Sequence, residues 1–389
     1  MAGDVKNREE LHEQNIRAIL AEVFNQQPIA RVDISKNLSL NKSTVSALYF
    51  DLKERGVVSE LGEGQASTSG GRKPVLIAIN NRYGFTINFD FGYRHLHIMR
   101  NDISGGILDY SQADVEGLRL SEIVQIIDEA IHDARRNDRS EHGLLGISFA
   151  IHGTVHNNQV TYSPFMDMEG IDLANVFETK YQVPVLLENE ANLSAVYERD
   201  FNDGHALNNA VTVSIHRGIG AGIIVNKELY HGDHGEAGEI GRSVIIGSAL
   251  GQTMMKVEDF CSEEAIISQL GQIKASQALD RQSVVELYNQ HDEDAVTVLN
   301  GFIRNIAMII SNVQNNYDPA TIFINSPLIE ELPSLLPPIT DHYQKMTKSN
   351  PVPIKMIADS HAATLQGGCA LITRQVLDLE NFELNFSAK

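Results

Sequence analysis

Two stretches of the sequence repeat one pattern, and this repeat constrains the fold more than any other feature. Residues 143–153, GLLGISFAIHG, form an apolar run that ends in a glycine turn. Residues 209–232, NAVTVSIHRGIGAGIIVNKELYHG, again contain an apolar run, a glycine turn and a second apolar run. Such runs, alternating with amphipathic segments such as 120–136, predict strands alternating with helices, which is an α/β architecture. Two similar halves predict a duplicated fold with a ligand-binding cleft between them.

Length and charge indicate that the chain also contains a second, smaller module. The chain has 389 residues, more than one ordinary core accommodates, so we expect two or three domains. Its net charge of −20 argues against non-specific nucleic-acid binding by the chain as a whole. The charge is uneven, however, because residues 1–75 contain 10 basic and 10 acidic residues and are neutral. This asymmetry indicates a small DNA-facing module on an acidic body.

The sequence predicts a soluble, cytoplasmic protein. No apolar run approaches the roughly 18 to 20 residues of a membrane span, and the N-terminus has no apolar signal region. The two cysteines, Cys261 and Cys369, lie far apart in the sequence. We expect both to be buried and to form neither a disulfide nor a zinc cluster.

Residues 1–78 predict a winged helix-turn-helix. Apolar residues recur at spacings of three and four over 7–26, a second helix fits 30–37, and a third begins after Asn41, a favourable N-cap residue. The outward face of the third helix combines a cation with short polar side chains in its first turn. A recognition helix touches base edges and phosphates with such groups.

A wing is expected after these helices. Two short apolar strands flank a Gly/Ser-rich tip that ends in two cations, which suits contact with phosphate or a minor groove. The stretch 62–70 would also let two DNA-binding heads adjust their spacing. The alternative is a plain three-helix bundle followed by a linker. The candidate DNA-binding residues are Arg31, Lys42, Ser43, Thr44, Ser46, Arg72 and Lys73.

Several motifs follow this module in a fixed order. They are G-R-K-P (71–74), D-x-G (90–92), E-N-x-A-N (188–192), G-I-G-A-G (218–222) and A-G-E-I-G (237–241). In this order, behind a winged helix, they resemble the ROK family over nearly the whole chain, and within it the xylose-repressor and N-acetylglucosamine-repressor type. The family contains sugar-responsive repressors and sugar kinases.

The resemblance implies an N-terminal winged helix-turn-helix joined to a duplicated α/β body of the actin-like, ribonuclease-H-like ATPase fold. We expect a DNA-binding domain with its wing in residues 1–78. Residues 79–190 would form the first α/β subdomain, completed by the C-terminal helix. Residues 191–389 would form the second subdomain, which binds sugar and mediates oligomerisation.

The motifs that serve phosphotransfer in the family's kinases are degraded. The first phosphate loop, D-x-G-G-T in the kinases, has Tyr93 and Arg94 as its last two residues, and their bulk should block the site. The second loop, G-T-G-I-G, contains Arg217, and the I-x-G-G segment near the adenosine ends in Asn325-Ser326. Glu190 stands where the kinases have the catalytic aspartate, and its extra methylene displaces the carboxylate. We therefore expect no kinase activity, and we interpret Glu190 as a ligand hook or a remnant.

No metal or other cofactor is expected. The family's zinc pattern begins with a histidine, where this chain has Arg242, and the stretch 243–258 contains no cysteine. The nearby HGDHGEAGE (231–239) offers histidines and carboxylates at irregular spacing, which is a weak ligand signal. We interpret it as a polar loop at the cleft.

The sugar pocket is altered rather than lost. Glu239, Asn189 and Glu258 match family positions that contact sugar hydroxyls or close the zinc motif, and polyol recognition needs several such groups. Phe165 could stack on a sugar or fill the pocket, and Arg242 could favour an anionic sugar. The candidate ligand-binding residues are Asn189, Glu190, Glu239, Arg242, Glu258, Phe165, His152 and Gly153.

The resemblance implies a sugar-responsive transcriptional regulator, most simply a repressor of carbohydrate-utilisation genes that a sugar releases from its operator. The expected partners are operator DNA, a sugar or sugar derivative, and further copies of the chain in a homodimer or dimer of dimers, without a membrane. Two alternatives remain. One is a DNA-binding regulator controlled by a protein partner instead of a small molecule, and the other is an active sugar kinase with an appended DNA-binding domain.

Overall fold

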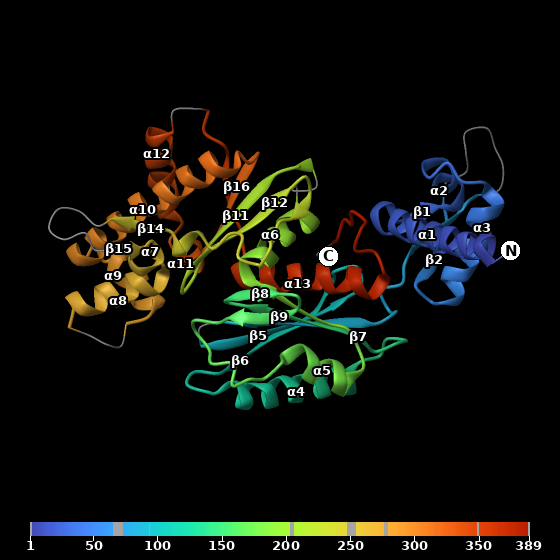
Figure 1. The fold of residues 1–389 in the computed structure, drawn as a ribbon, viewed down its shortest axis with the longest axis horizontal. Helices are drawn as coiled ribbons and strands as arrows, with labels where there is room; N and C mark the ends of the chain where they lie inside the picture. Colours follow the sequence, from blue (N-terminus) through green and yellow to red (C-terminus); the bar gives the residue numbers. More distant parts are fainter. Residues whose placement is uncertain are drawn as a thin grey trace.

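The chain forms a two-part α/β body with a smaller module at one end (Figure 1). The structure is a computed structural model that describes residues 2–64, 73–92, 94–202, 206–246, 254–275, 279–347 and 350–387. Arg72, Tyr93 and residues 65–70 of the expected wing tip lie outside the described residues.

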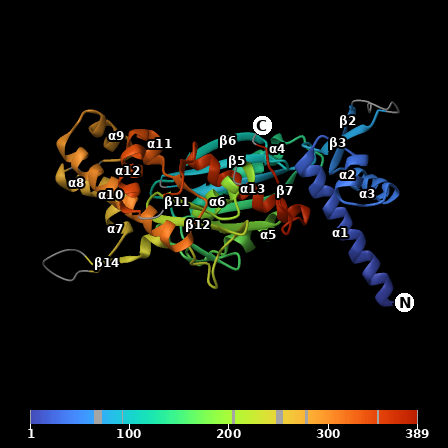
Figure 2. The same ribbon diagram turned by 90° about the horizontal axis from the view of Figure 1, so that it is seen from above.

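The N-terminal module contains three helices and a small sheet. Its elements are α1 Ala2–Gln26, β1 Ile29–Ala30, α2 Arg31–Asn37, α3 Lys42–Glu54, β2 Val58–Glu63 and β3 Val75–Ile79. The strands pair antiparallel in the order β1-β3-β2, and the helices bury Ile19, Ile34 and Val45 against one another and against the sheet. The expected helices and strands are therefore present in the expected order. Figure 2 shows α1 extending away from the body toward the N-terminus.

One expectation about this module is wrong. The Gly/Ser-rich stretch 62–70, of which residues 65–70 lie outside the described residues, begins with the last two residues of β2 and is followed in sequence by β3, and these two strands pair within one sheet. It therefore lies inside the module and cannot set the distance between the module and the body. The module joins the body through residues 80–84, where Asn80 donates its backbone N–H to the carbonyl of Val57.

The first half of the body is a five-stranded mixed sheet with the order β10-β7-β4-β5-β6. Its central strands, β4 and β7, are parallel and mostly buried, and β4 alternates apolar residues with the buried polar residues Thr86, Asn88 and Asp90. Helices α4 and α5 cover one face (Figure 1). Its elements are β4 Phe85–Phe91, β5 His95–Asp102, β6 Ile107–Asp114, α4 Leu120–Asn137, β7 Leu144–Ile151, β8 Thr154–His156, β9 Gln159–Tyr162, α5 Leu173–Tyr181 and β10 Val185–Asn189.

The second half repeats this topology with the order β13-β12-β11-β16-β17. In each half the first three strands are antiparallel, and two further strands add in parallel beside the first. Its strands and short 3-10 turns are β11 Ala210–Ile215, β12 Ile219–Val225, β13 Glu228–Leu229, η2 Ile240–Arg242, β14 Val244–Ile246, β15 Met254–Lys256, β16 Thr321–Asn325, η3 Pro333–Leu335 and β17 Ile354–Met356. Its helices are α7 Glu258–Cys261, α8 Glu263–Ile273, α9 Arg281–Asn289, α10 Glu293–Tyr317, α11 Pro327–Glu331 and α12 Leu336–Met346.

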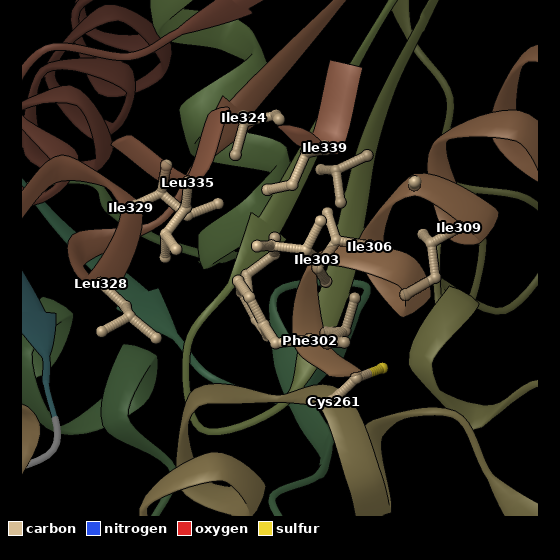
Figure 3. Close-up of a cluster of buried hydrophobic side chains, with 14 of the residues drawn as sticks. Cys261, Phe302, Ile303, Ile306, Ile309, Ile324, Leu328, Ile329, Leu335 and Ile339 are labelled. Atoms are coloured by element: carbon tan, nitrogen blue, oxygen red, sulfur yellow. The ribbon is translucent and has the colours of Figure 1, made fainter. Parts of the chain in front are cut away.

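Helix α10 is central to the core of the second half. Figure 3 shows Phe302, Ile303 and Ile306 of this helix meeting Cys261 and apolar residues from neighbouring elements. By length and composition α10 could cross a membrane, contrary to the expectation that no segment comes close. One face of the helix, however, is buried in this core, which accounts for its apolar composition. Both cysteines are buried and free as expected, and burial raises the pKa of each thiol to about 12.

Two helices cross between the halves. Helix α6 Glu190–Phe201 packs mainly on β12 and β11 of the second sheet, whereas α13 Ser360–Leu377 packs mainly on β4 and β7 of the first. The helices touch where Gly367 faces the backbone of Leu193, and a β-carbon at Gly367 would lie 2.0 Å from that carbonyl oxygen. The two halves therefore meet through a close helix crossing, beside which the cleft lies.

Candidate functional site

A small cavity of about 60 Å³ lies between the two halves, at the N-terminus of α6. All eight residues expected to bind a ligand line it, although they come from positions 152 to 258 in the sequence. Ligand pockets for small molecules measure about 300 to 1,000 Å³. The cavity in this conformation is therefore too small for a sugar, and a ligand must displace one of its walls.

The side chain of Asn189 connects two walls of the cavity. It is the N-cap of α6, and its Oδ1 accepts from the N–H groups of Ala191 (2.8 Å) and Asn192 (3.2 Å). Its Nδ2 donates to the carbonyl oxygen of Gly153 at 2.8 Å. Asn189 thus joins the helix to the β7–β8 turn of the other wall and fixes the position of Gly153.

Glu190, the first residue of α6, is buried in a polar network. Its Oε1 accepts from Ser214 Oγ at 2.6 Å and from Asn325 Nδ2 at 3.1 Å, and His216 Nε2 lies 3.3 Å away. Burial raises the pKa of Glu190, but His216 and the other donors outweigh burial and hold the pKa below its ordinary value. The carboxylate is ionised and already engaged by protein groups. Asn325, the residue where the kinases have glycine, supplies one of these donors.

A second buried carboxylate, Asp90 at the end of β4, is held by histidines. Its Oδ1 lies 2.9 Å from His152 Nε2, and its Oδ2 lies 3.6 Å from His361 Nδ1. Burial raises the pKa of Asp90, but His152 and His361 outweigh burial and hold it well below its usual range. Burial conversely lowers the pKa of His152, and Asp90 raises it above the ordinary value. A histidine therefore lies beside each carboxylate oxygen of Asp90, the first residue of the D-x-G motif.

The ring of His361 continues this cluster away from the cavity. It stacks on His97 with centroids 3.9 Å apart, and His97 Nδ1 lies 2.6 Å from the Tyr110 hydroxyl. Burial, followed by the charge of His361, lowers the pKa of His97 to about 4. His97 is thus neutral at neutral pH. We define Asp90, His152, Glu190, His216, Asn325 and His361 as the histidine cluster.

Glu239 and Arg242 form an ion pair on the opposite side of the cavity. Arg242 Nε lies 3.1 Å from Glu239 Oε2, and Glu239 Oε1 accepts from Thr154 Oγ1 at 3.2 Å. The guanidinium also covers the Tyr162 ring at 4.4 Å. Burial raises the pKa of Glu239 despite the opposing effect of Arg242. Because Glu239 compensates the charge of Arg242, this geometry gives little support to the idea of an anionic ligand.

Glu258 reaches the cavity from the start of α7. Its Oε2 lies where β-carbons on Gly218 and Gly241 would come within 3.1 and 2.9 Å of it. Two glycines therefore leave room for this carboxylate beside the backbone of β12 and η2. Glu239 and Glu258 together place two acceptors on one wall, which suits a ligand rich in hydroxyl donors.

Phe165 separates the small cavity from a larger one of about 460 Å³. His152 and His216 also line both cavities, and the Arg217 guanidinium lies over the Phe165 ring at 4.5 Å. Phe165 therefore fills the boundary in this conformation. Displacing its ring would enlarge the small cavity toward the larger one.

The HGDHGEAGE loop distributes its side chains among different partners. His231 Nε2 lies 2.7 Å from Glu188 Oε2, and this contact raises the pKa of His231, whereas Glu236 and Glu239 face Arg242. Among the described residues no group of three or more histidine, cysteine or acidic side chains has metal-binding geometry. The geometry agrees with a polar loop.

The candidate DNA-binding residues lie on one module. Lys42 and Ser43 are exposed in the first turn of α3, and Thr44 and Ser46 are partly exposed. Lys73 is exposed just before β3. Arg31 is partly buried, and its guanidinium stacks over the rings of Tyr49 (5.1 Å) and Phe50 (5.5 Å) of α3.

Several residues of the site were not predicted. Ser214, Asn325 and Thr154 engage the expected carboxylates, and His361 engages Asp90. In the sequence, Asn325 was marked only by its departure from the I-x-G-G motif of the family's kinases. His361 carried no sequence signal, because it belongs to α13 and reaches the site through the crossing of the two halves.

Comparison with known proteins identifies the family. The ROK family model matches residues 87–375, which is most of the chain. The chain belongs to the ROK family. The motif-based identification is thus confirmed, and the body has the actin-like ROK fold.

Among relatives, the xylose repressor of Lactiplantibacillus pentosus is 44% identical over 382 residues, covering 98% of this ROK chain and 97% of the relative. A solved ROK family transcriptional regulator, described as a homologue of the E. coli MLC protein, superposes with a TM-score of 0.77 at 22% identity and covers 95% of this chain and 98% of its own. A ROK family glucokinase from Streptomyces griseus, solved with glucose and AMPPNP, has a TM-score of 0.64 at 21% identity and covers 74% of this chain and 99% of its own. The kinase thus matches a smaller share of this chain than the regulator does.

Proposed function

We propose that this chain is a xylose-responsive repressor, in which residues 1–78 bind operator DNA as a winged helix-turn-helix and a sugar bound between the two halves releases the DNA. The observation that carries this proposal is the convergence of the eight pocket residues on one cavity of an intact two-half body. The name of the xylose repressor with 44% identity supports both the repressor function and the sugar. Glu239 and Glu258 supply acceptors for the hydroxyl groups of a pentose.

The N-terminal module has the geometry that DNA recognition needs. Helix α3 buries Val45, Leu48, Tyr49 and Leu52, so its opposite face is free to enter a major groove. We expect Lys42, Ser43, Thr44 and Ser46 to contact the DNA from this face. Arg31 would act beside them while stacked on α3, and the wing would place Lys73 and Arg72 at phosphate or in a minor groove.

Salt dependence tests this DNA-binding proposal. Lys42→Ala should weaken binding to a selected operator and reduce the slope of log K against log salt by about 1, because one phosphate contact is lost. Lys345→Ala on α12 of the body is the control and should leave the slope unchanged. A Lys42→Ala protein with wild-type affinity and slope would contradict the assignment of α3 as the recognition helix.

The sugar response is tested by a thermal-shift screen against pentoses, hexoses, amino sugars and their phosphates. A ligand at about 100 times its Kd should stabilise the protein by roughly 2.7 kcal/mol. We expect D-xylose to stabilise the wild type and to lose most of its effect in Glu239→Ala. Stabilisation by another sugar alone would contradict the assignment of xylose while leaving a sugar-responsive protein.

We propose that the chain is not an enzyme. A kinase needs backbone amides around the phosphates and a free carboxylate at the sugar hydroxyl. Here Glu190 accepts from Ser214 and Asn325, and Asp90 is paired with two histidines. The likeness to a solved glucokinase keeps sugar phosphorylation as the competing function. Formation of xylose phosphate from ATP by the purified protein, lost in Glu190→Gln, would establish it.

A second competing function is regulation by a protein partner. The small volume of the cavity and the position of Phe165 favour this alternative, because a sugar cannot enter without displacing a wall. A thermal-shift screen in which no sugar stabilises the wild type would support it.

We further propose a cytoplasmic homodimer or dimer of dimers without a membrane association. Two-fold symmetry of such an oligomer would match a palindromic operator. Helix α10 passes a length and composition test for a membrane span, but its burial in the core of the second half supports a soluble body. Sedimentation of the protein with and without operator DNA measures the oligomeric state.

A further inference from the structure

One route from the ligand cavity to the DNA-binding module runs through helix α6 and the C-terminal segment that follows α13. Helix α6 begins at Asn189 and Glu190 in the cavity wall and ends at Asp200 and Phe201. Its 12 residues span about 18 Å. A movement of the cavity wall therefore displaces the far end of a rigid element.

The C-terminal segment, residues 378–387, lies on this far end. The backbone N–H of Phe386 donates to the carbonyl oxygen of Asp200 at 2.9 Å. Its ring stacks on Phe201 of α6 with centroids 5.2 Å apart and meets Phe24 of α1 edge-on at 4.8 Å. Phe386 is buried and therefore contacts the body and the DNA-binding module with one side chain.

Polar contacts fix the same segment to α1. The side chain of Asn25 donates to the carbonyl oxygen of Glu383 and accepts from the backbone N–H of Asn385, both at 2.8 Å. Arg17 of α1 pairs with Asp378 at 2.6 Å. The segment also shares one apolar cluster with the module, in which Leu379 and Leu384 are buried. The module thus rests on the C-terminal segment as well as on the body.

The segment also joins the two crossing helices. Arg374 in the last turn of α13 makes a bidentate ion pair with Asp200 of α6, with distances of 2.5 and 3.0 Å, and both side chains are buried. Its guanidinium lies 5.5 Å from the Phe386 ring. Because α13 packs on the first half and α6 on the second, a rotation of one half against the other changes the surface on which Phe386 lies.

We propose that residues 378–387 transmit closure of the sugar pocket to the DNA-binding module, with Phe386 as the central positioning residue. This inference rests on the proposed function, since it names the element that couples its two sites. A sugar can shift DNA affinity only if it binds the two arrangements of the halves unequally. The segment converts that difference into a changed position of α1, and with it of α3.

The test compares the DNA affinity of the full-length protein with and without saturating D-xylose. Coupling between two sites commonly changes affinity by about 5- to 150-fold, and we expect a ratio in this range for the wild type. Phe386→Ala should bring the ratio to within about twofold of one. The Kd for D-xylose and the Kd for operator DNA without sugar should each stay within about threefold of wild type. Glu380→Ala, an exposed position of the same segment, is the matched control and should keep the wild-type ratio.

A second variant guards against misfolding. Asn25→Ala removes the two hydrogen bonds from α1 to the segment at an exposed site and should also reduce the ratio. Wild-type ratios of DNA affinity with and without xylose in both Phe386→Ala and Asn25→Ala would overturn the proposal. Equal losses of sugar binding, DNA binding and coupling in both variants would also overturn it, because they would indicate a purely structural role. A wild-type protein that binds no operator or does not respond to xylose would instead contradict the proposed function.

Discussion

The two ends of the cleft differ in how their side chains are engaged. At one end, Glu239 and Glu258 still face a cavity, and glycines leave them room. At the other, where phosphate loops would lie in a kinase, histidines and other donors engage Asp90 and Glu190, and His152, His216 and His361 line the larger cavity of about 460 Å³. We infer that phosphate binding and hydroxyl recognition have different structural requirements. Phosphate binding depends on close approach to bare backbone and is lost when side chains enter, whereas hydroxyl recognition needs only a few well-placed acceptors.

We therefore expect the histidine cluster to stabilise the fold, and Glu239 and Glu258 to bind the sugar. Removing one partner of a buried ion pair leaves an uncompensated charge and costs about 3–5 kcal/mol. Asp90→Ala should therefore lower the free energy of unfolding by about 3–5 kcal/mol while the Kd for D-xylose changes by less than about threefold. Urea denaturation and calorimetry measure the two quantities, with Asp90→Asn as the milder control. Loss of sugar binding at unchanged stability would reverse the assignment of roles.

Glu239→Ala should weaken sugar binding and leave the free energy of unfolding nearly unchanged. A hydrogen bond to a charged group contributes about 1.5–3 kcal/mol, so sugar affinity should fall roughly 10- to 150-fold. The free energy of unfolding without ligand should change by less than about 1 kcal/mol, because Glu239 is partly exposed and burial already opposes its ionisation. Isothermal titration with D-xylose provides the affinity. An unaffected affinity would remove Glu239 from the binding site.

Acid should lower the free energy of unfolding through His97, which stacks on His361 of the histidine cluster. The pKa of His97 in the folded protein, about 4, lies below its ordinary value of 6.5, so the unfolded chain takes up a proton first as the pH falls. The contribution of His97 is fully present above about pH 6.5 and is lost progressively toward pH 4, amounting to about 3 kcal/mol. The groups that face this ring are His361, Asp90, His95, His152 and Tyr110. His97→Gln should lose less stability than the wild type between pH 7.5 and 4.5, and identical slopes in urea-denaturation series would contradict this.

The smallest expected effect concerns the charge of the ligand. Because Glu239 compensates Arg242, the pocket should prefer neutral sugars, and Arg242→Gln should alter the ratio of affinities for D-xylose and xylose phosphate by less than about threefold. Competition titrations measure this ratio. A larger drop in affinity for the phosphate alone would show that Arg242 recognises an anion after all.

The sequence predicted where the halves, the cleft and the N-terminal elements lie, because apolar periodicity and glycine turns are local signals. It also predicted which residues surround the cavity, since family motifs mark backbone positions. It did not predict what those residues do within the protein. Asn189 caps a helix, and the partners of Glu190 and Asp90, such as Asn325 and His361, come from distant segments. Hydrogen-bond saturation depends on tertiary contacts that no local pattern encodes. The expected spacing role of the 62–70 stretch was wrong for the same reason, because the pairing of β2 with β3 depends on tertiary contacts.

Release of DNA by sugar is measured most directly by fluorescence anisotropy of a labelled operator during titration with D-xylose. The operator is first selected from a random DNA pool with the full-length protein. We expect tight binding without sugar and release as xylose saturates, with Glu239→Ala bound to the same DNA and unresponsive at the same sugar concentration. An operator complex that persists in the wild type at saturating xylose, or that dissociates equally in Glu239→Ala, would contradict the account.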